Sequence, residues 1–581
     1  LVSPWGIGST VTVQGVVTGD FTGTTPGSTD FNAFYINDVN GDGDPLTSDG
    51  LMIYYGSTNP AIVVGDVVRV EGKVAEYQNV TEISSVSSVT NCGHSPTTIS
   101  PVAIDLPLAE GTTFEPLEGM LVTFTDPLVV AQNYFLGRYG QMHLSLRRFF
   151  NPTNGQGDTK DEFLRSSIVL DDGNASQNPR PTPYIGDNNT VRAGDTVLAG
   201  LTGFMDEGAI NSDTTIRGYR LQPVHSSVSI TRTNDRPAAP TITGSTLKVV
   251  GYNVENYFTT LDVKPYTAPY DNSNTPRGAD SAEEFTRQRN DLFAGLVALN
   301  PDVFGVTELE AWDAAAAPQD FVDGLNAAAG VSGEYAFIED PATGVGSDYI
   351  QNGLFYKIGA VTPVGASMSS TDSIYKRAPI AQTFMDNNGN TFSVIVNHFK
   401  SKGSCPDPAD PDYDLEKDNG QGCWNHTRTL EAQALLTFIE EVKTASGDPD
   451  VLVIGDLNSY GAEDPIIALT DGGLVNEMAL VPAADRYSYV FDGFSGYLDH
   501  ALSTSSLHTQ IAGVKPWHAN ADEPSIIDYN VEYKYPIQTY YPDDLFAADG
   551  YRASDHDPIV IGLNLPTPVV TSISPNMKMA G

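Results

Sequence analysis

The stretch "DVLVIGDLNS" (450–459) sets an apolar run directly before a carboxylate and an amide, Asp456 and Asn458. A short apolar run bounded by polar residues is typical of a buried strand. Residues two positions apart in a strand face the same way, so Asp456 and Asn458 would present their oxygen atoms side by side at one sheet edge. Upstream lie a second apolar run, "NTFSVIVNHF" (390–399), and a helical pattern, "RTLEAQALLTFIEEV" (428–442). This strand–helix–strand order predicts an α/β domain.

The same alternation extends to both sides of this stretch. The runs "KVVGYN" and "VFGVTE" flank a helical pattern over 281–300, where Ser281 and Glu284 form a capping box. A linker rich in proline, "RTNDRPAAPTITG", precedes this region. We therefore expect a linker over 232–244, an α/β domain over 245–565 and a C-terminal tail over 566–581.

The N-terminal part has a different texture, with alternating strands and turns. A Gly-Asp turn at Gly65-Asp66 is repeated at Gly194-Asp195, each followed by a strand. This pattern is common in small Greek-key barrels and predicts two β-barrel-like modules, over 1–100 and 101–231; the alternative is an array of β-hairpins. Residues 1–100 hold only two cationic side chains, Arg69 and Lys73, against ten acidic ones, which does not support a nucleic-acid groove in the first module.

The amino-acid composition limits the classes of function that are compatible with the chain. The 581 residues predict three or four domains, and the formal net charge is −42. Such acidity repels polyanions at long range, so a permanent nucleic-acid partner is not expected. An enzyme that contacts phosphate only through a metal site remains compatible with this charge.

Polar side chains stand at the ends of five predicted strands. Carboxylate and amide oxygens suit Mg²⁺, Mn²⁺ or Ca²⁺. The sequence shows neither a Ser or Cys nucleophile elbow nor a Gly-rich phosphate loop, so acyl transfer and nucleotide binding of that kind are not supported. A hard metal with carboxylates and imidazoles points to attack of water on a phosphate ester. The strand-end residues are Asn253, Glu308, His398, Asp456 with Asn458, and Asp555 with His556.

Six segments occur in an order that resembles the endonuclease/exonuclease/phosphatase superfamily, the fold of deoxyribonuclease I. The segments are "YNVEN", "VTELE", "VNHFKSKG", "IGDLNS", "YLDHAL" and "SDHDPIV". The resemblance implies a four-layer α/β sandwich, with two mixed sheets face to face and helices outside. "RGADSAEEFTRQR" and the upstream β module further resemble secreted bacterial extracellular nucleases, which implies an oligonucleotide-barrel (OB)-like N-terminal module and a secreted or cell-surface location.

The resemblance also implies a role for each site residue. Glu308 would be the principal metal ligand, with Asn253 and Asp555 nearby. Asp456 would position or deprotonate the attacking water, and Asn458 would hold the phosphate. His398 and His556 would contact phosphate oxygens, and Asp499 would orient His556 through its second ring nitrogen. His500 stands where an arginine often occurs, and we expect it to be an ordinary exposed histidine; we expect Asp557 to make a structural hydrogen bond.

Two features lie beside the predicted centre. Lys400, Lys402 and Arg428 are cations that we expect to contact the substrate phosphate. Cys405 and Cys423 bracket a long acidic loop, for which we favour a disulfide over two unrelated thiols, leaving Cys92 unpaired.

A separate stretch, "DVNGDGDPLTSD" (38–49), has the spacing of a calcium loop. The alternative is a polar hairpin loop, because its flanks look like strands and the usual final Glu is an Asp. The candidate calcium ligands are Asp38, Asn40, Asp42, Asp44 and Asp49.

These observations together favour a secreted nuclease that depends on Mg²⁺ or Mn²⁺ and cleaves DNA, with RNA as a further candidate substrate and no insertion into membranes. One alternative is a phosphatase or phospholipase C-type hydrolase of the same superfamily. Another is an inactive adhesive or matrix-binding protein. The tryptophan and arginine that typically flank the Gly-Asp-x-Asn segment in phosphatase members are missing from "VLVIGDLNSYG".

Overall fold

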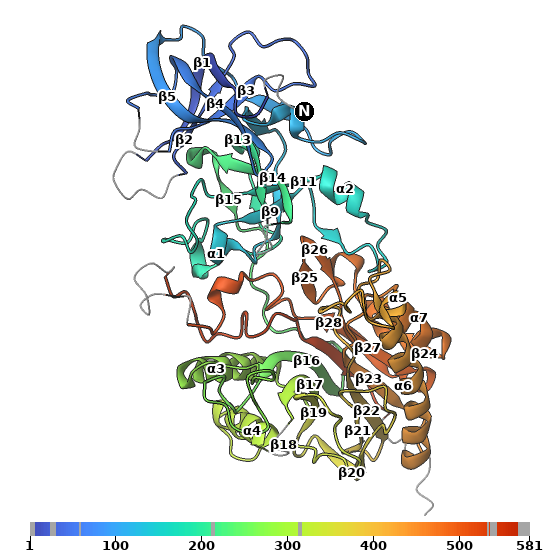
Figure 1. Cartoon of the computed structure of the whole chain (residues 1–581). Helices are drawn as coiled ribbons and strands as arrows, with labels where there is room; N and C mark the ends of the chain where they lie inside the picture. Colours follow the sequence, from blue (N-terminus) through green and yellow to red (C-terminus); the bar gives the residue numbers. More distant parts are fainter. Residues whose placement is uncertain are drawn as a thin grey trace, which may run out of the picture.

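The computed structural model describes residues 6–23, 31–56, 60–210, 215–311, 316–531, 534 and 543–566. Figure 1 shows two β-rich parts toward the N-terminus and a mixed domain of helices and strands formed by the C-terminal half. Of the predicted C-terminal tail, only Pro566 lies within the described residues. No helix in those ranges combines the length and apolarity needed to cross a membrane.

The first β-rich part is a ring in which each strand pairs with two others, in the order β1-β2-β3-β5-β4. Buried and more exposed residues alternate along much of β4, as expected for a strand with one face on a core. Val17, Phe34 and Val68 are among the residues that fill the ring. Its likeness to an OB module stays a prediction. The strands are β1 (Thr10–Phe21), β2 (Ala33–Asn37), β3 (Gly50–Tyr54), β4 (Asp66–Tyr77) and β5 (Val80–His94).

The second β-rich part, called here the second module, is a nine-stranded sheet in the order β15-β12-β8-β9-β11-β14-β13-β7-β6. Its edge strands β15 and β6 do not pair with each other within the described structure, so the prediction of a second small barrel is wrong. Gly65 and Gly194 share the predicted turn, with φ of 95° and 101°, but a turn fixes only local geometry, whereas closure requires pairing between distant strands. The strands are β6 (Val102–Ile104), β7 (Leu121–Phe124), β8 (Leu128–Gln132), β9 (Met142–Ser145), β11 (Ser167–Leu170), β12 (Thr196–Val197), β13 (Thr202–Ala209), β14 (Arg217–Pro223) and β15 (Ile230–Thr231).

Short helices lie in the loops of the second module. They are η1 (Glu115–Leu117), α1 (Leu136–Tyr139), α2 (Lys160–Arg165), η2 (Asp187–Asn189) and η3 (His225–Ser227).

The C-terminal domain contains two six-stranded mixed sheets. β16 runs parallel to β17, and β22 runs parallel to β23, while their other neighbours are antiparallel. One sheet has the order β18-β19-β17-β16-β29-β28 and the other β20-β21-β22-β23-β27-β24. The strands are β16 (Leu247–Tyr257), β17 (Val303–Glu310), β18 (Tyr335–Phe337), β19 (Ile350–Lys357), β20 (Val361–Ser369), β21 (Ile380–Asp386), β22 (Thr391–His398), β23 (Val451–Asp456), β24 (Leu474–Asn476), β27 (Asp499–Thr504), β28 (Ile511–Pro516) and β29 (Ile559–Leu563).

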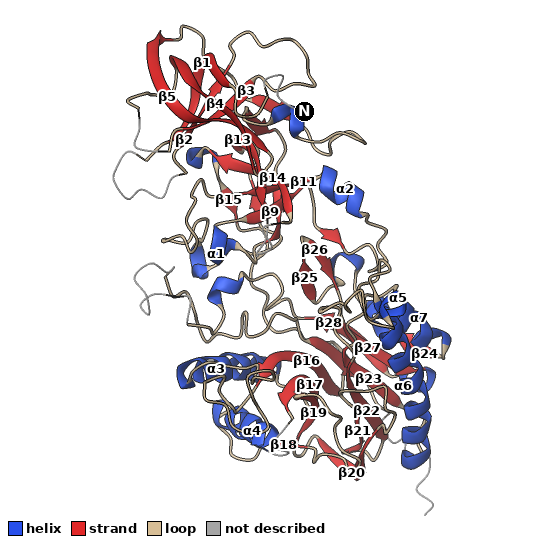
Figure 2. Ribbon diagram, in the orientation of Figure 1, coloured by secondary structure: helices blue, strands red, loops and turns tan. Residues whose placement is uncertain are grey.

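The two sheets pack face to face, with helices on their outer faces (Figure 2). Val249, Val396 and Ile454 belong to the apolar core between the sheets. α3 and α4 cover the first sheet through residues such as Leu292 and Phe321, and a second apolar cluster joins α6 and α7 to the other sheet. The helices are α3 (Ala282–Leu299), α4 (Ala316–Ala328), α5 (Tyr413–Glu416), α6 (Asn425–Ser446), α7 (Asp464–Asp471), α8 (Ser505–His508), η4 (Glu477–Leu480), η5 (Ala483–Asp485) and η6 (Ser525–Ile527).

The N-terminus of α3 forms as the capping-box pattern predicts. The Ser281 hydroxyl accepts a hydrogen bond from the backbone N–H of Glu284, at 3.2 Å. Satisfying this free N–H fixes where the helix begins. The apolar face of the helix is then directed to the core, with Leu292, Phe293 and Leu296 buried.

A small sheet joins the second module to the C-terminal domain. It has the order β10-β26-β25, in which β10 (Phe149–Phe150) belongs to the module, and β25 (Tyr489–Phe491) and β26 (Phe494–Gly496) form a hairpin of the C-terminal domain. Strand pairing across this boundary fixes the two parts more firmly than side-chain contacts alone would.

Candidate active site

Side chains from the ends of both six-stranded sheets meet at one place. β17 carries Glu308, β22 ends at His398, β23 ends at Asp456, and His556 stands shortly before β29. The Nε2 atom of His398 lies 3.8 Å from Oε1 of Glu308 and 3.5 Å from Oδ2 of Asp456. Nε2 of His556 lies 4.0 Å from the same Asp456 oxygen. The convergence that the strand ends predict is therefore present in the structure.

Asp456 lies at the centre of this group. Its Oδ2 accepts hydrogen bonds from the amide groups of Asn253, at 3.2 Å, and Asn458, at 3.3 Å, and its Oδ1 accepts one from the backbone N–H of Asn458, at 2.7 Å. Burial, reinforced by the nearby Asp499 and Glu308 carboxylates, raises the pKa of Asp456 to about 7. A carboxylate with this pKa can exchange a proton near neutral pH.

Glu308 is held in a strained backbone conformation. Its φ is 71°, in the left-handed region that residues with side chains rarely adopt, and such strain is concentrated at functional sites. Its carboxylate accepts hydrogen bonds from the Asn253 amide, at 3.1 Å, and from the backbone N–H of Asn256, at 3.0 Å. Burial and the nearby Asp555 carboxylate raise the pKa of Glu308. The two carboxylates thus repel each other, and a cation between them would relieve that repulsion.

His556 is oriented by contacts to its Nδ1 atom and to its ring. Its Nδ1 lies 2.7 Å from Oδ2 of Asp499, and the Ser488 hydroxyl donates to the same oxygen at 2.7 Å. The ring of Tyr489 packs against the imidazole, with centroids 4.6 Å apart. Burial opposes protonation of His556, but Asp499, Asp555 and Asp456 outweigh it and raise the imidazole pKa well above 6.5. The surrounding acids therefore favour the protonated form of His556, which presents Nε2 to the centre.

The surroundings of His398 shift its pKa in the opposite direction. Burial and the adjacent Arg377 guanidinium lower the pKa of His398 well below 6.5. Nη1 of Arg377 lies 3.0 Å from Nε2 and 3.2 Å from Nδ1 of His398, and Nη2 donates to the carbonyl of Phe399 at 2.7 Å. The site therefore disfavours protonation of His398 and favours protonation of His556.

Arg377 was missed by sequence reasoning. It lies in the loop between β20 and β21, within "YKRAPI", and not at a strand end. The only sequence signal was a pair of cations in an acidic protein, which does not distinguish a site residue from a solvated one.

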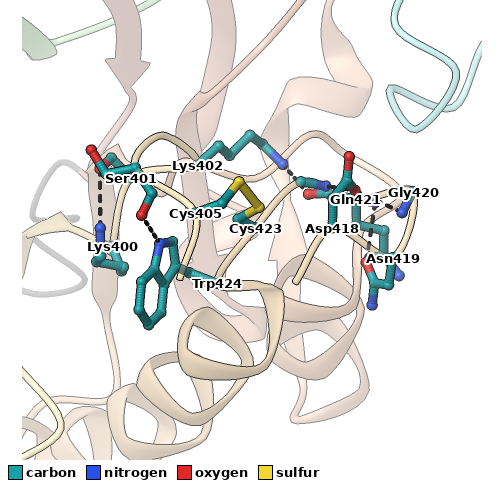
Figure 3. The surroundings of a disulfide bond; sticks show 12 residues. Lys400, Ser401, Lys402, Cys405, Asp418, Asn419, Gly420, Gln421, Cys423 and Trp424 are labelled. Atoms are coloured by element: carbon teal, nitrogen blue, oxygen red, sulfur yellow. Dashed lines mark hydrogen bonds between the residues drawn. A yellow bond between two sulfur atoms is a disulfide. The ribbon is translucent and has the colours of Figure 1, made fainter. Parts of the chain in front are cut away.

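The three expected phosphate-binding cations differ in their surroundings, and Figure 3 shows two of them, Lys400 and Lys402. Lys402 lies three residues before Cys405, the first cysteine of the disulfide loop (Cys405–Cys423). Its ammonium group donates to the carbonyl of Gln421 and to the buried Glu463, and burial lowers its pKa to about 8. Arg428 is fully buried and donates to backbone carbonyls, including those of Cys423 and Gln421. Arg428 is thus a structural residue of the loop, and Lys402 is engaged by Glu463, so neither has the free guanidinium or ammonium group that a phosphate contact requires.

Lys400 fits the expectation best. It is partly exposed two residues after His398, and its ammonium group lies 4.9 Å from the ring centroid of Trp424. Burial and Arg377 lower its pKa. Figure 3 shows Lys400 and Trp424 on the side of the disulfide loop opposite to Gln421.

The same loop contains the predicted disulfide. Cys405 and Cys423 are joined by an S–S bond, and Cys92 is a free, exposed cysteine. The pairing inferred from the bracketed acidic loop is confirmed.

The expectations for Asp557, a structural hydrogen bond, and for His500, an exposed side chain, have opposite outcomes. The side chain of Asp557 accepts hydrogen bonds from the backbone N–H groups of Asn520, at 2.8 Å, and Ala521, at 3.0 Å, so its predicted structural role is confirmed. The expectation that His500 is exposed is wrong. His500 is fully buried, its Nε2 lies 2.7 Å from the carbonyl of Ser459, and burial lowers its pKa to about 4. It lies in β27, which is buried along its entire length.

The donor set fits a hard divalent cation. Glu308 and Asp555 supply carboxylates close enough to repel each other, whereas Asn253 turns its Nδ2 toward Glu308 and Asp456 and would have to rotate its amide to become a ligand. Within the described residues, no three His, Cys, Asp or Glu side chains form a ready metal cage. Such a site suits Mg²⁺, which commonly takes one or two carboxylates and completes its shell with water and substrate oxygens.

The stretch with calcium-loop spacing forms a loop closed by its own hydrogen bonds. The Asp49 carboxylate accepts from the backbone N–H of Asp42 at 3.1 Å, and the Asp42 carboxylate accepts from the backbone N–H of Asp44 at 2.8 Å. Asp38 caps the N–H of Asn40 at 2.9 Å in the same way. Calcium binding by this loop stays a prediction.

The sequence itself establishes the family. A model of the Endonuclease/Exonuclease/phosphatase family matches residues 250–556, which is more than half of the chain, and the protein belongs to this family. Its members are hydrolases that act on phosphodiester or phosphate esters, and they generally use divalent metal ions. No match was found among curated proteins.

Several solved structures are similar to about half of the chain. One is an endonuclease/exonuclease/phosphatase family protein from Bacteroides thetaiotaomicron, at 16% identity, covering 55% of this chain and 94% of that one, with a TM-score of 0.34. Another is a mannosyl-6-phosphatase from the same organism, at 15% identity, 55% and 99% coverage and a TM-score of 0.33. A third is D. rerio TDP2 complexed with single strand DNA product, at 16% identity, 55% and 99% coverage and a TM-score of 0.32.

Proposed function

We propose that the protein is a secreted nuclease that hydrolyses phosphodiester bonds of extracellular DNA with the help of Mg²⁺ or Mn²⁺, and that RNA is a further substrate. The observation that carries this proposal is the position of Asp456, which lies 3.5 Å from His398 and 4.0 Å from His556. Hydrolysis of a phosphate ester requires a base, a proton donor and a bound cation. This site brings together a base, a proton donor and a pair of acids that can bind the cation.

Each residue contributes one step of the proposed reaction. Glu308 and Asp555, with Asn253 after rotation of its amide, would hold the divalent ion, which when bound polarises a phosphate ester and offsets its charge. Asp456, fixed by the Asn253 and Asn458 amides, accepts a proton from the attacking water.

The two histidines complete the site. His556 donates from Nε2 to a phosphoryl oxygen, while Asp499 holds Nδ1 and the ring orientation. His398, held by Arg377, offers a second contact without adding a charge that would compete with the ion.

The substrate class is proposed from what surrounds this site. The missing phosphatase signature favours a diester over a phosphate monoester. We also propose that the N-terminal ring of strands is an OB-like module. With a net charge of −42, attraction to DNA at long range is weak or repulsive, so added salt screens repulsion as well as attraction. We expect mild inhibition by salt, or even stimulation.

The test compares plasmid DNA, an RNA, an inositol phosphate and sphingomyelin vesicles at a fixed Mg²⁺ concentration across a salt series. The expected result is cleavage of DNA with a shallow salt dependence and negligible release of phosphate from the inositol phosphate. Faster turnover of inositol phosphate or sphingomyelin would replace the nuclease with a phosphatase or phospholipase. Absence of any hydrolysis would favour a binding protein.

A further inference from the structure

The hairpin formed by β25 and β26 is a wall of the candidate active site. Tyr489 at the start of β25 packs on His556, and the preceding residue, Ser488, donates to the Asp499 oxygen that holds His556. The carbonyl of Ser488 also accepts the backbone N–H of Asp557, at 2.8 Å. The position of this hairpin therefore decides where the imidazole of His556 lies.

The outer edge of the same hairpin is paired with the second module. Phe149 and Phe150 of β10 run parallel to Phe494 and Ser495 of β26, and the N–H of Asn151 donates to the carbonyl of Ser495 at 2.8 Å. An apolar cluster of Ala131, Phe149, Phe163 and Phe494 closes the contact. The module thus supplies the edge strand of the sheet that orients the catalytic histidine.

Arg148 connects the module to the hairpin at a buried point. Its Nη1 donates to the Ser495 hydroxyl at 2.7 Å and to the fully buried Asp522 at 3.0 Å. The guanidinium lies 4.4 Å from the ring centroid of Tyr487, whose hydroxyl donates to Asp522 at 2.8 Å. Tyr487 directly precedes Ser488, so the contacts of Arg148 reach the residue that supports Asp499.

Asn154 ties the two ends of the hairpin together. Its Oδ1 accepts from the backbone N–H of Tyr497 at 2.9 Å, and its Nδ2 donates to the carbonyl of Arg486 at 3.2 Å. Gly496 makes room for this approach, because a Cβ there would lie 3.2 Å from Oδ1 of Asn154 and 2.4 Å from the Tyr460 ring. Asp499 follows only two residues after Tyr497.

We propose that Arg148 and Asn154 of the second module are positioning residues for the His556–Asp499 pair, so that the module is part of the catalytic unit and not a separate attachment. The proposal rests on the proposed function for its kinetic consequence but not for its structural one. A displacement of the order of 1 Å in a catalytic group costs about 10²-fold in rate. Loosening the hairpin therefore lowers kcat while leaving substrate contacts elsewhere unchanged.

A second arginine of the same module serves as a control. Arg165 of α2 donates to the Asp161 carboxylate at 2.8 Å and to the carbonyl of Leu108 at 2.9 Å, both within the second module. Arg148→Met and Arg165→Met remove the same charge from the module. Arg148→Met leaves Asp522 buried without one of its cations and can disturb folding, so Asn154→Ala, which leaves no unpaired charge, is tested in parallel.

The experiment measures kcat and KM on a DNA oligonucleotide for the full chain, together with hydrogen exchange of peptides spanning 486–499. We expect Arg148→Met and Asn154→Ala to lower kcat by about 10-fold or more with KM within about 2-fold, and to speed exchange in those peptides. Arg148→Lys should recover part of the loss, and Arg165→Met should match the wild type.

Wild-type kcat or wild-type exchange in folded Asn154→Ala protein would overturn the proposal. If the wild-type chain cleaves no DNA, the proposed function fails, and hydrogen exchange alone decides whether the module holds the hairpin.

Discussion

Oδ2 of Asp499 lies 2.7 Å from both Nδ1 of His556 and the hydroxyl of Ser488. Because a carboxylate oxygen only accepts, the proton of this pair sits on Nδ1 of the imidazole, and Nε2 is the atom that faces Asp456. A single oxygen thus holds the Nδ1–H group and the ring orientation of His556, whose Nε2 lies 4.0 Å from Asp456.

The first prediction follows from this pair. His556→Ala and Asp456→Asn should each lower the rate of DNA hydrolysis by about 10²-fold or more, because each removes a proton donor or acceptor while the fold stays intact. Ser488→Ala removes only the second partner of Asp499 and should cost less. The measurement is kcat/KM with circular dichroism as a control for folding; wild-type turnover in either of the first two variants would mean that the site is misassigned.

The main features of this site could be predicted because its signals are local. A short apolar run ended by Asp456 or His398 specifies both a strand and the edge at which its polar side chain emerges. Parallel pairing of β22 with β23 then brings those ends together without further information. The capping box at Ser281 is likewise a property of four consecutive residues.

What escaped prediction depends on contacts between distant segments. Arg377 and Ser488 reach the site from loops, and no periodicity marks a loop residue that packs against a strand end. His500 follows Asp499 in β27, which is buried along its entire length, and no local feature of the sequence marks that burial. Arg428 shows the same limit, since only the folded loop supplies the carbonyl groups that bind it.

The second prediction concerns the divalent ion. Excess chelator should abolish hydrolysis, and Mg²⁺ or Mn²⁺ should restore it, because Glu308 and Asp555 are hard oxygen donors, and burial and Asp555 raise the pKa of Glu308. Glu308→Gln should lower activity and raise the Mg²⁺ concentration needed for half-maximal rate. Full activity in excess chelator would rule out the metal-dependent mechanism.

The third prediction concerns the cysteines. Thiol counting on the denatured, unreduced chain should find one free thiol, that of Cys92, because Cys405 and Cys423 are bonded to each other. Alkylation before and after reduction, followed by peptide mass analysis, identifies which cysteines react. Three thiols without reduction would contradict the disulfide, and Cys92→Ser provides the control that should leave none.

The last prediction uses a buried acid outside the active site. Asp291 of α3 is buried, and its Oδ1 accepts from the backbone N–H of Gly550 at 2.6 Å, while its Oδ2 has no hydrogen-bond partner among the described residues. Burial is the largest cause that raises the pKa of Asp291, to about 8. The folded chain therefore keeps this proton up to about pH 8, whereas an unfolded aspartate loses it near its usual value of 3.8.

The sign of the effect follows from this difference in bound protons. Between about pH 4 and pH 8 the folded state binds more protons than the unfolded state, so the free energy of unfolding falls as pH rises through that window. The stabilising contribution of the Asp291 proton is complete only below this window. Asp291→Asn keeps an acceptor for Gly550 but cannot ionise. Its melting temperature relative to the wild type should rise steadily from pH 4 to pH 8 and level off above that. Asp471→Asn, at the exposed end of α7, is the control that should show no such trend. A relative melting temperature that is flat or falls with pH would show that Asp291 ionises in the folded chain at its ordinary pKa.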